Sequence, residues 1–138
     1  EDVRRKLLIL ARAAGAELEH EAVAVASLST RALTEATAET LDATFSTLDA
    51  PLRDAYAAAY ERGKKLRYIA RWERGEARAG LEFLPADDPL LGGRGTDNRI
   101  AIWSDRYRDR PLVIQGPGAG AEVTAAALLD DALAIATT

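Results

Sequence analysis

An acid and an amine stand one helical turn apart at the start of the chain, where Asp2 is followed by Lys6. An aldehyde that accepts a hydride leaves an alkoxide that must be protonated, and the reverse reaction needs a base for the hydroxyl proton. A partly desolvated lysine can serve both directions, because burial lowers its pKa towards neutrality. The same spacing suits a surface ion pair, and Glu1 and Arg5 repeat it. The residues alone leave both interpretations open.

A second stretch with chemical potential lies near the other end of the chain. A short apolar run over 112–114 predicts a buried strand, and an Ala- and Leu-rich stretch over 122–136 predicts a helix. Between them lies a turn that contains three glycines, Gly116, Gly118 and Gly120. Glycine lets the backbone approach a phosphate or a polar ring closely. A turn that merely joins strand to helix is the simpler alternative.

The glycine turn also fits a dinucleotide pattern, which we do not accept. Gly116, Gly118 and Ala121 satisfy G-x-G-x-x-A. That fingerprint requires a second strand, which ends in an acidic residue about 20 positions later. No such strand follows before Thr138. We therefore expect this turn not to be the first crossover of a Rossmann fold and to bind no pyrophosphate.

Composition excludes several classes of protein. The 138 residues suffice for one domain, and 48% hydrophobic with 29% charged residues is typical of a soluble globular protein. A net charge of −4 and scattered arginines argue against nucleic-acid and membrane partners. With no cysteine and a single histidine, His20, we expect neither a disulfide framework nor a metal site. No apolar run approaches the length of a membrane span.

The first half of the chain predicts helices around one strand. A helix over 2–14 should end at Gly15, and its apolar stripe should face the core: Val3, Leu7, Leu10 and Ala14. Residues 18–28 alternate around Val23 and Val25 and predict a strand. A helix from Thr30 to about Leu48 should follow, and then a second helix that begins near Asp49 with Pro51 in its first turn.

The second half predicts further strands. Residues 65–74 alternate in polarity, and a two-residue turn at Gly75-Glu76 should lead into a strand over 77–84. Another strand is expected over 99–104, after a turn that Asp97 and Asn98 fix through side-chain to backbone bonds. We therefore predict an α+β fold: an open-faced sandwich with a largely antiparallel or mixed sheet of about five strands and helices on one face.

Three segments together resemble homoserine dehydrogenases, including the dehydrogenase half of bifunctional aspartokinase–homoserine dehydrogenases. They are D-V-R-R-K-L-L-I from Asp2, D-P-L followed by G-T-D-N from Asp88, and P-L-V-I-Q-G-P-G-A-G-A-E-V-T-A from Pro111. The resemblance covers essentially the whole chain, and Arg4 departs from the alanine that is usual there. It implies that Lys6 is catalytic, that Asp2 binds substrate and that Gly120 contacts the cofactor, NADP or NAD.

The same resemblance implies an activity and a context. The complete enzyme would interconvert L-aspartate 4-semialdehyde and L-homoserine in the cytoplasm, as a homodimer that associates through the sheet. Residues 1–138 would be its substrate-binding and catalytic domain, without the N-terminal nucleotide-binding domain. We therefore expect the chain alone to be inactive. The alternative is a non-catalytic α+β dimerisation or interaction domain, in which Asp2 and Lys6 point into solvent instead of sharing a cleft with Gly120.

Overall fold

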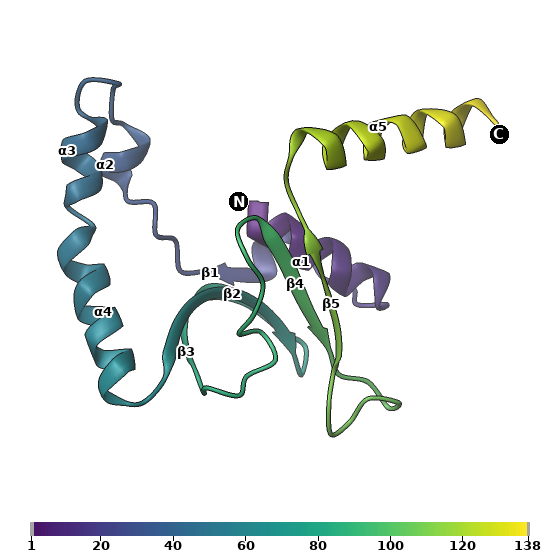
Figure 1. The fold of residues 1–138 in the computed structure, drawn as a ribbon, viewed down its shortest axis with the longest axis horizontal. Coiled ribbons are helices and arrows are strands. Elements are labelled where there is room, and N and C mark those ends of the chain that lie inside the picture. The colour runs from purple at the N-terminus through teal and green to yellow at the C-terminus, as the bar shows by residue number, and fades with distance from the viewer. Residues whose placement is uncertain (1, 138) are drawn as a thin grey trace. The chain divides into compact units, whose positions relative to one another are not determined.

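The computed structural model describes residues 2–137, so the predicted Glu1–Arg5 pair lies outside the described residues. The chain divides into two compact units, the first ending at Ala86 and the second beginning at Asp87. The first unit holds a three-stranded mixed sheet in the order β1-β3-β2, and the second an antiparallel pair, β4-β5 (Figure 1). The predicted α+β class with five strands is confirmed, and the strands are divided between two sheets.

Helix α1 (Asp2–Ala13) packs against the sheet of the first unit and builds its core. The core comprises six buried apolar residues: Leu7, Leu8, Ala11, Leu18, Val23 and Ala77. The predicted core stripe is therefore wrong at Leu10, which is 41% exposed, and at Ala14, which is exposed beyond the end of α1, while Leu8 is buried. A run of four apolar residues from Leu7 to Leu10 gives α1 two possible faces, and the sheet selects one of them.

Gly15 ends α1 as predicted. Its φ of +91° is left-handed, which glycine adopts without steric cost. The Ala16 N–H donates to the Ala11 carbonyl (2.9 Å) and the Gly15 N–H to the Arg12 carbonyl (2.9 Å), which is the Schellman pattern. The Arg12 guanidinium then bonds the Leu18 carbonyl (2.8 Å), so the chain turns back over its own helix.

The predicted strand over 18–28 is much shorter in the structure. A single 3₁₀ turn (His20–Ala22) precedes strand β1 (Val23–Val25). β1 runs parallel to β3, with Val23 opposite Ala77, and Val23 is 1% exposed. The strand is short because the segment before it is used to return from α1. Beyond it, the Ser29 N–H bonds the Ser27 hydroxyl (3.0 Å), a local turn that competes with strand pairing.

The long helix predicted up to Leu48 is broken into two short ones, α2 (Arg31–Thr34) and α3 (Leu41–Ser46). Hydroxyls between them bond the local backbone: the Thr37 N–H donates to Thr40 Oγ1 (3.0 Å). The Thr37 hydroxyl also donates to the Glu39 carboxylate (2.6 Å), which holds the pKa of Glu39 below its ordinary value. These bonds replace the helical ladder that the Ala-rich composition suggested.

Helix α4 (Asp49–Glu61) begins where it was expected, with Pro51 in its first turn. Its N-cap is Leu48, so Asp49 is the first helical residue and not the cap. The helix packs against β2, and Ala59 is its buried residue. Near its end, the Arg62 guanidinium lies 5.2 Å from the ring centre of Phe83, a cation–π contact that joins α4 to β3.

Strands β2 (Lys65–Glu73) and β3 (Glu76–Leu84) form the predicted hairpin, but its turn lies one residue earlier than expected. Glu73 pairs with Glu76, so Arg74 and Gly75 are the turn residues. Their φ angles are +54° and +83°, as in a type I′ turn. The prediction of Gly75-Glu76 was wrong because arginine is an unusual choice for a left-handed position.

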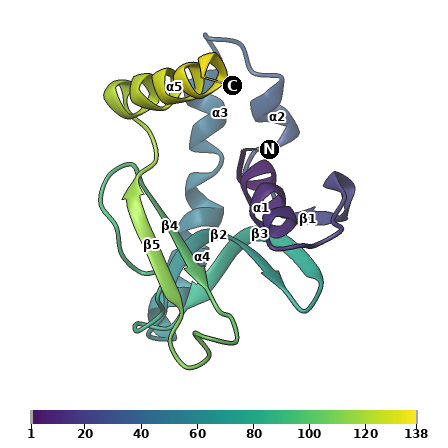
Figure 2. The ribbon, with the colours of Figure 1, turned by 90° about the vertical axis from the view of Figure 1, so that its right-hand side faces the viewer.

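The second unit consists of β4 (Asp97–Ile102), β5 (Leu112–Pro117) and α5 (Ala121–Ala136), as Figure 2 shows. β4 begins two residues before the predicted start at Arg99. The burial expected for the apolar run in β5 is not found, since Ile114 is 51% exposed. β5 pairs only with β4, which leaves the face that carries Ile114 open in the described part of this unit.

Helix α5 confirms the predicted helix over 122–136 and is largely apolar, with Glu122, Asp130 and Asp131 as its charged residues. None of its described residues is buried. Among the described residues, no helix has both the length and the apolarity that a membrane crossing would require.

Replacing Arg74 by Asn should stabilise the protein by about 0.5–1 kcal/mol, because asparagine tolerates the left-handed conformation that a type I′ turn imposes. The free energy of unfolding in urea measures the effect. Arg74→Lys is the matched control: it keeps the charge and the steric cost, and it should leave stability unchanged. Equal stability of the Asn and Lys variants would contradict this account of the turn.

Candidate functional site

Asp2 and Lys6 meet on the outer side of α1. The Lys6 Nζ lies 3.0 Å from Asp2 Oδ2, and the side chains are 51% and 75% exposed for Lys6 and Asp2 respectively. Leu7, Leu8 and Ala11 face the sheet, so helical periodicity directs the ion pair away from it. An exposed pair of this kind contributes at most about 1 kcal/mol to stability. The packing of α1 against the sheet therefore does not depend on the Asp2–Lys6 pair. Both charged groups of the pair are accessible to a ligand.

Arg4, the departure from the family pattern, lies on another side of the same helix. It follows Asp2 by two residues, which corresponds to a rotation of about 200° around the axis. Arg4 is partly buried, whereas Asp2 and Lys6 are exposed. The substitution therefore does not intrude on the space over the ion pair.

The glycine segment is shorter than the sequence suggested. Gly116 is not part of the turn, because it lies in β5 opposite Asn98, and Pro117 pairs with Asp97. The connection to α5 is therefore only Gly118–Gly120. Three glycines were expected to offer free N–H groups. Gly116 lies within the sheet instead, and the Gly118 N–H already donates to the Thr96 carbonyl (3.0 Å).

Thr96 and Asn98 both contact this connection, and sequence reasoning assigned neither of them to it. The Thr96 hydroxyl donates to the Ala119 carbonyl (3.2 Å). The amide of Asn98 lies where a side chain at Gly118 would have to go. The antiparallel register of β4 and β5 brings these residues together. The signal was available in the G-T-D-N motif, but placing the strand start at Arg99 concealed it.

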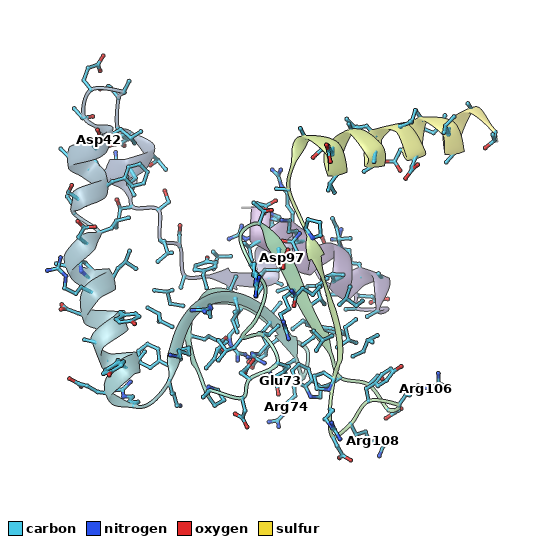
Figure 3. The ribbon with its side chains drawn as sticks, viewed as in Figure 1. Asp42, Glu73, Arg74, Asp97, Arg106 and Arg108 are labelled. Atoms are coloured by element: carbon cyan, nitrogen blue, oxygen red, sulfur yellow. The ribbon has the colours of Figure 1, made fainter. Side chains whose placement is uncertain are left out.

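Asp97 fixes the turn before β4, as predicted (Figure 3). Its carboxylate accepts a bond from the Arg94 N–H (3.0 Å) and another from Gln115 Nε2 (2.9 Å). The Gln115 side-chain oxygen Oε1 accepts in turn from the Arg99 guanidinium, which also donates to the Pro89 backbone carbonyl. This network ties the loop before β4 to both strands, so the first residues of β4 have a defined position.

Gly120 has a backbone conformation that other residues avoid. Its φ is 142° and its ψ 148°, a combination that is essentially restricted to glycine. It is the N-cap of α5, and its carbonyl accepts the first helical bond from the Thr124 N–H (3.0 Å). A Cβ built at Gly120 would meet no atom within 4 Å. The conformation, and not crowding, therefore requires glycine here.

The predicted site residues lie in different units of the chain, with Asp2 and Lys6 in the first and Gly120 in the second. That they share one cleft stays a prediction. His20 Nδ1 lies 3.5 Å from the Glu21 carboxylate, and we assign it no function. Over residues 2–137, no group of three or more His, Cys, Asp or Glu side chains is arranged to hold a metal ion.

Comparison with known proteins places these features in a family. Residues 1–133 match the family model described as homoserine dehydrogenase. The chain is 43% identical to the bifunctional aspartokinase/homoserine dehydrogenase 2 of Escherichia coli, a match that covers 94% of this chain and 16% of that protein. It is 32% identical to the homoserine dehydrogenase of Emericella nidulans, over 97% of this chain and 39% of the relative. The chain thus spans less than half of either relative.

A solved structure shares the fold of this chain. The crystal structure of a protein of unknown function from Candida auris has a TM-score of 0.83 to this chain, at 37% identity, over 99% of this chain and 39% of that one.

Gly120→Ala should lower the free energy of unfolding by about 1–3 kcal/mol, because alanine cannot adopt the observed φ and ψ without strain. Gly116→Ala is the control: its φ is not left-handed, a Cβ there also meets nothing within 4 Å, and the substitution should cost much less. Chemical denaturation of both variants measures the difference. A Gly120→Ala variant as stable as Gly116→Ala would rule out the conformational requirement.

Proposed function

Because the chain belongs to the homoserine dehydrogenase family, we propose that it is the substrate-binding and catalytic part of an enzyme that interconverts L-aspartate 4-semialdehyde and L-homoserine. The observation that carries the proposal is the Asp2–Lys6 pair, with its 3.0 Å separation and its open side. The chain spans 16% of the E. coli relative and 39% of the E. nidulans one, which supports assigning the proposed activity to a longer polypeptide of which these residues form a part.

In this proposal Lys6 moves the proton. When bound, NADPH or NADH would supply the hydride for the aldehyde carbon, and the oxidised cofactor would take it up in the reverse direction. The Lys6 ammonium donates a proton to the developing alkoxide, and in the oxidative direction its free amine accepts the hydroxyl proton.

Asp2 is assigned two tasks in the same step. Its carboxylate lies within ion-pair distance of Lys6 and therefore limits the directions in which the ammonium can point. One of its oxygens can also accept a hydrogen bond from the α-ammonium group that substrate and product share. The Asp2 carboxylate would thus bind the α-ammonium group of the substrate, which does not react, and orient Lys6, which transfers the proton.

Gly120 is proposed to contact the nicotinamide side of the cofactor. The open space beside its Cα supports this role, because a flat ring can approach a backbone that carries no side chain. Most of the cofactor, including its pyrophosphate, would be held by the nucleotide-binding domain elsewhere in the polypeptide. The choice between NADP and NAD would be made there as well.

A homodimer that associates through the sheet is also proposed, and one observation favours it. The apolar face of the β4-β5 pair stays open, with Ile102 and Leu112 each 39% exposed and Ile114 51% exposed. Two strands alone are marginally stable in water, so such a face needs a partner. The alternative function, a dimerisation domain without chemistry, shares this feature and lacks the roles proposed for Asp2, Lys6 and Gly120.

Lys6→Ala in the complete enzyme should lower kcat/KM for homoserine by about 10²- to 10⁴-fold, the usual contribution of a positioned acid or base. Stability should change little, because the ion pair is exposed. Steady-state kinetics and thermal denaturation of the purified variant provide the two readouts. Lys64→Ala removes an exposed lysine in the turn after α4 and should keep wild-type turnover. Near-wild-type activity of Lys6→Ala would favour the non-catalytic alternative.

The 138-residue chain by itself should not oxidise NADPH in the presence of aspartate 4-semialdehyde, because the proposal places the pyrophosphate-binding part elsewhere. Absorbance at the nicotinamide band measures the rate, and the complete enzyme under the same conditions is the positive control. Turnover by the isolated chain would show that its own residues suffice to bind the cofactor, and it would sink this part of the proposal.

A further inference from the structure

The ladder between β4 and β5 continues past the last paired residues. Asp97 pairs with Pro117, and one step further the Gly118 N–H donates to the Thr96 carbonyl (3.0 Å). The Thr96 side chain adds a second hydrogen bond, to the residue after Gly118: its hydroxyl donates to the Ala119 carbonyl (3.2 Å). Thr96 therefore holds Gly118 through its backbone and Ala119 through its side chain. These are the two residues immediately before Gly120.

We infer that Thr96 is a positioning residue that holds Gly118–Gly120 against the start of β4 and so sets the backbone of Gly120 for the nicotinamide. The inference rests on the proposed function, in which Gly120 contacts the cofactor. Thr96 itself need not touch the cofactor. Its hydroxyl acts through the Ala119 carbonyl, one peptide away from the glycine that does.

The connection needs such a restraint because of its composition. Two of its three residues are glycines, which lose the most conformational freedom when they become ordered. Gly120 must also keep a φ of 142°, one of many angles open to a glycine in a free loop. The apolar helix that follows has no buried residue among those described, so α5 supplies no packing to fix the direction of the loop.

Thr96 is itself well anchored. The Asp97 N–H donates to the Arg94 carbonyl (3.1 Å), and the Asp97 carboxylate bonds the Arg94 N–H and Gln115 Nε2. Asp97 follows Thr96 directly and is the first residue of β4, and Gln115 belongs to β5. The Asp97 carboxylate therefore joins the two strands beside Thr96. The amide of Asn98 lies against Gly118 from the same strand. The connection is thus held by the turn that precedes β4, through Thr96, and by Asn98 of the strand itself.

The test compares three variants of the full-length protein. Thr96→Val removes the hydroxyl and keeps the shape, and Thr96→Ser keeps the hydroxyl. Thr44→Val is the matched control: its hydroxyl also bonds a backbone carbonyl, that of Thr40 (2.8 Å), but in helix α3 of the other unit. The measurements are amide hydrogen exchange over residues 118–122, equilibrium binding of NADPH by fluorescence, and steady-state KM and kcat.

Thr96→Val should accelerate amide exchange in the connection and raise both the Kd and the KM for NADPH by roughly three- to tenfold, the usual effect of one lost hydrogen bond. The kcat at saturating NADPH should stay within about twofold, because Thr96 touches none of the reacting atoms. Thr96→Ser should restore wild-type exchange and KM, and Thr44→Val should match the wild type throughout.

Three results would overturn the inference. The first is unchanged exchange in Thr96→Val, and the second is faster exchange with unchanged NADPH affinity. The third is a Ser variant that behaves like Val, because the hydroxyl would then not be responsible. If the wild-type protein neither binds NADPH nor oxidises homoserine, the proposed function fails and the cofactor role of Thr96 falls with it. Exchange in Thr96→Val would then still decide whether Thr96 orders the connection.

Discussion

The packing of α1 against the sheet is the contact on which the first unit depends. Its most buried members are small: Ala11 and Val23 are each 1% exposed, and Ala77 is 5% exposed. Residues of this size let the helix come close to the strands, and Leu7, Leu8 and Leu18 fill the core around them. The same contact decides which side of α1 faces outward. Asp2 and Lys6 are accessible because Leu7, Leu8 and Ala11 are not.

The second unit solves a different problem, which is how to hold a flexible glycine connection without a hydrophobic core around it. It uses hydrogen bonds along an antiparallel ribbon, supported by the Asp97 carboxylate and its partners on both strands. Polar bonds at an exposed site are individually weak, but several that converge on one loop restrict its geometry. A backbone that must meet a ligand can thus remain free of side chains and still have a defined conformation.

Sequence patterns predicted elements well where local chemistry controls the backbone. Gly15 ends α1, Pro51 lies in the first turn of α4, and α5 follows the glycine connection. They failed where two local choices compete. The hydroxyls of Thr37 and Thr40 interrupt a stretch whose composition favours a helix, and Arg74 takes a left-handed position that Gly75-Glu76 was expected to supply.

The sequence by itself determined the family, because short motifs at fixed spacing carry that information. The roles of Asp2, Lys6 and Gly120 remain proposals. The sequence also determined the α+β class, since hydrophobic periodicity is local. Only the tertiary structure decided which face of α1 is buried, because Leu8 and Leu10 are chemically equal until a sheet lies against one of them. It alone brought Thr96 to Ala119, 23 residues apart in the chain, since strand register is fixed by pairing and not by either strand alone.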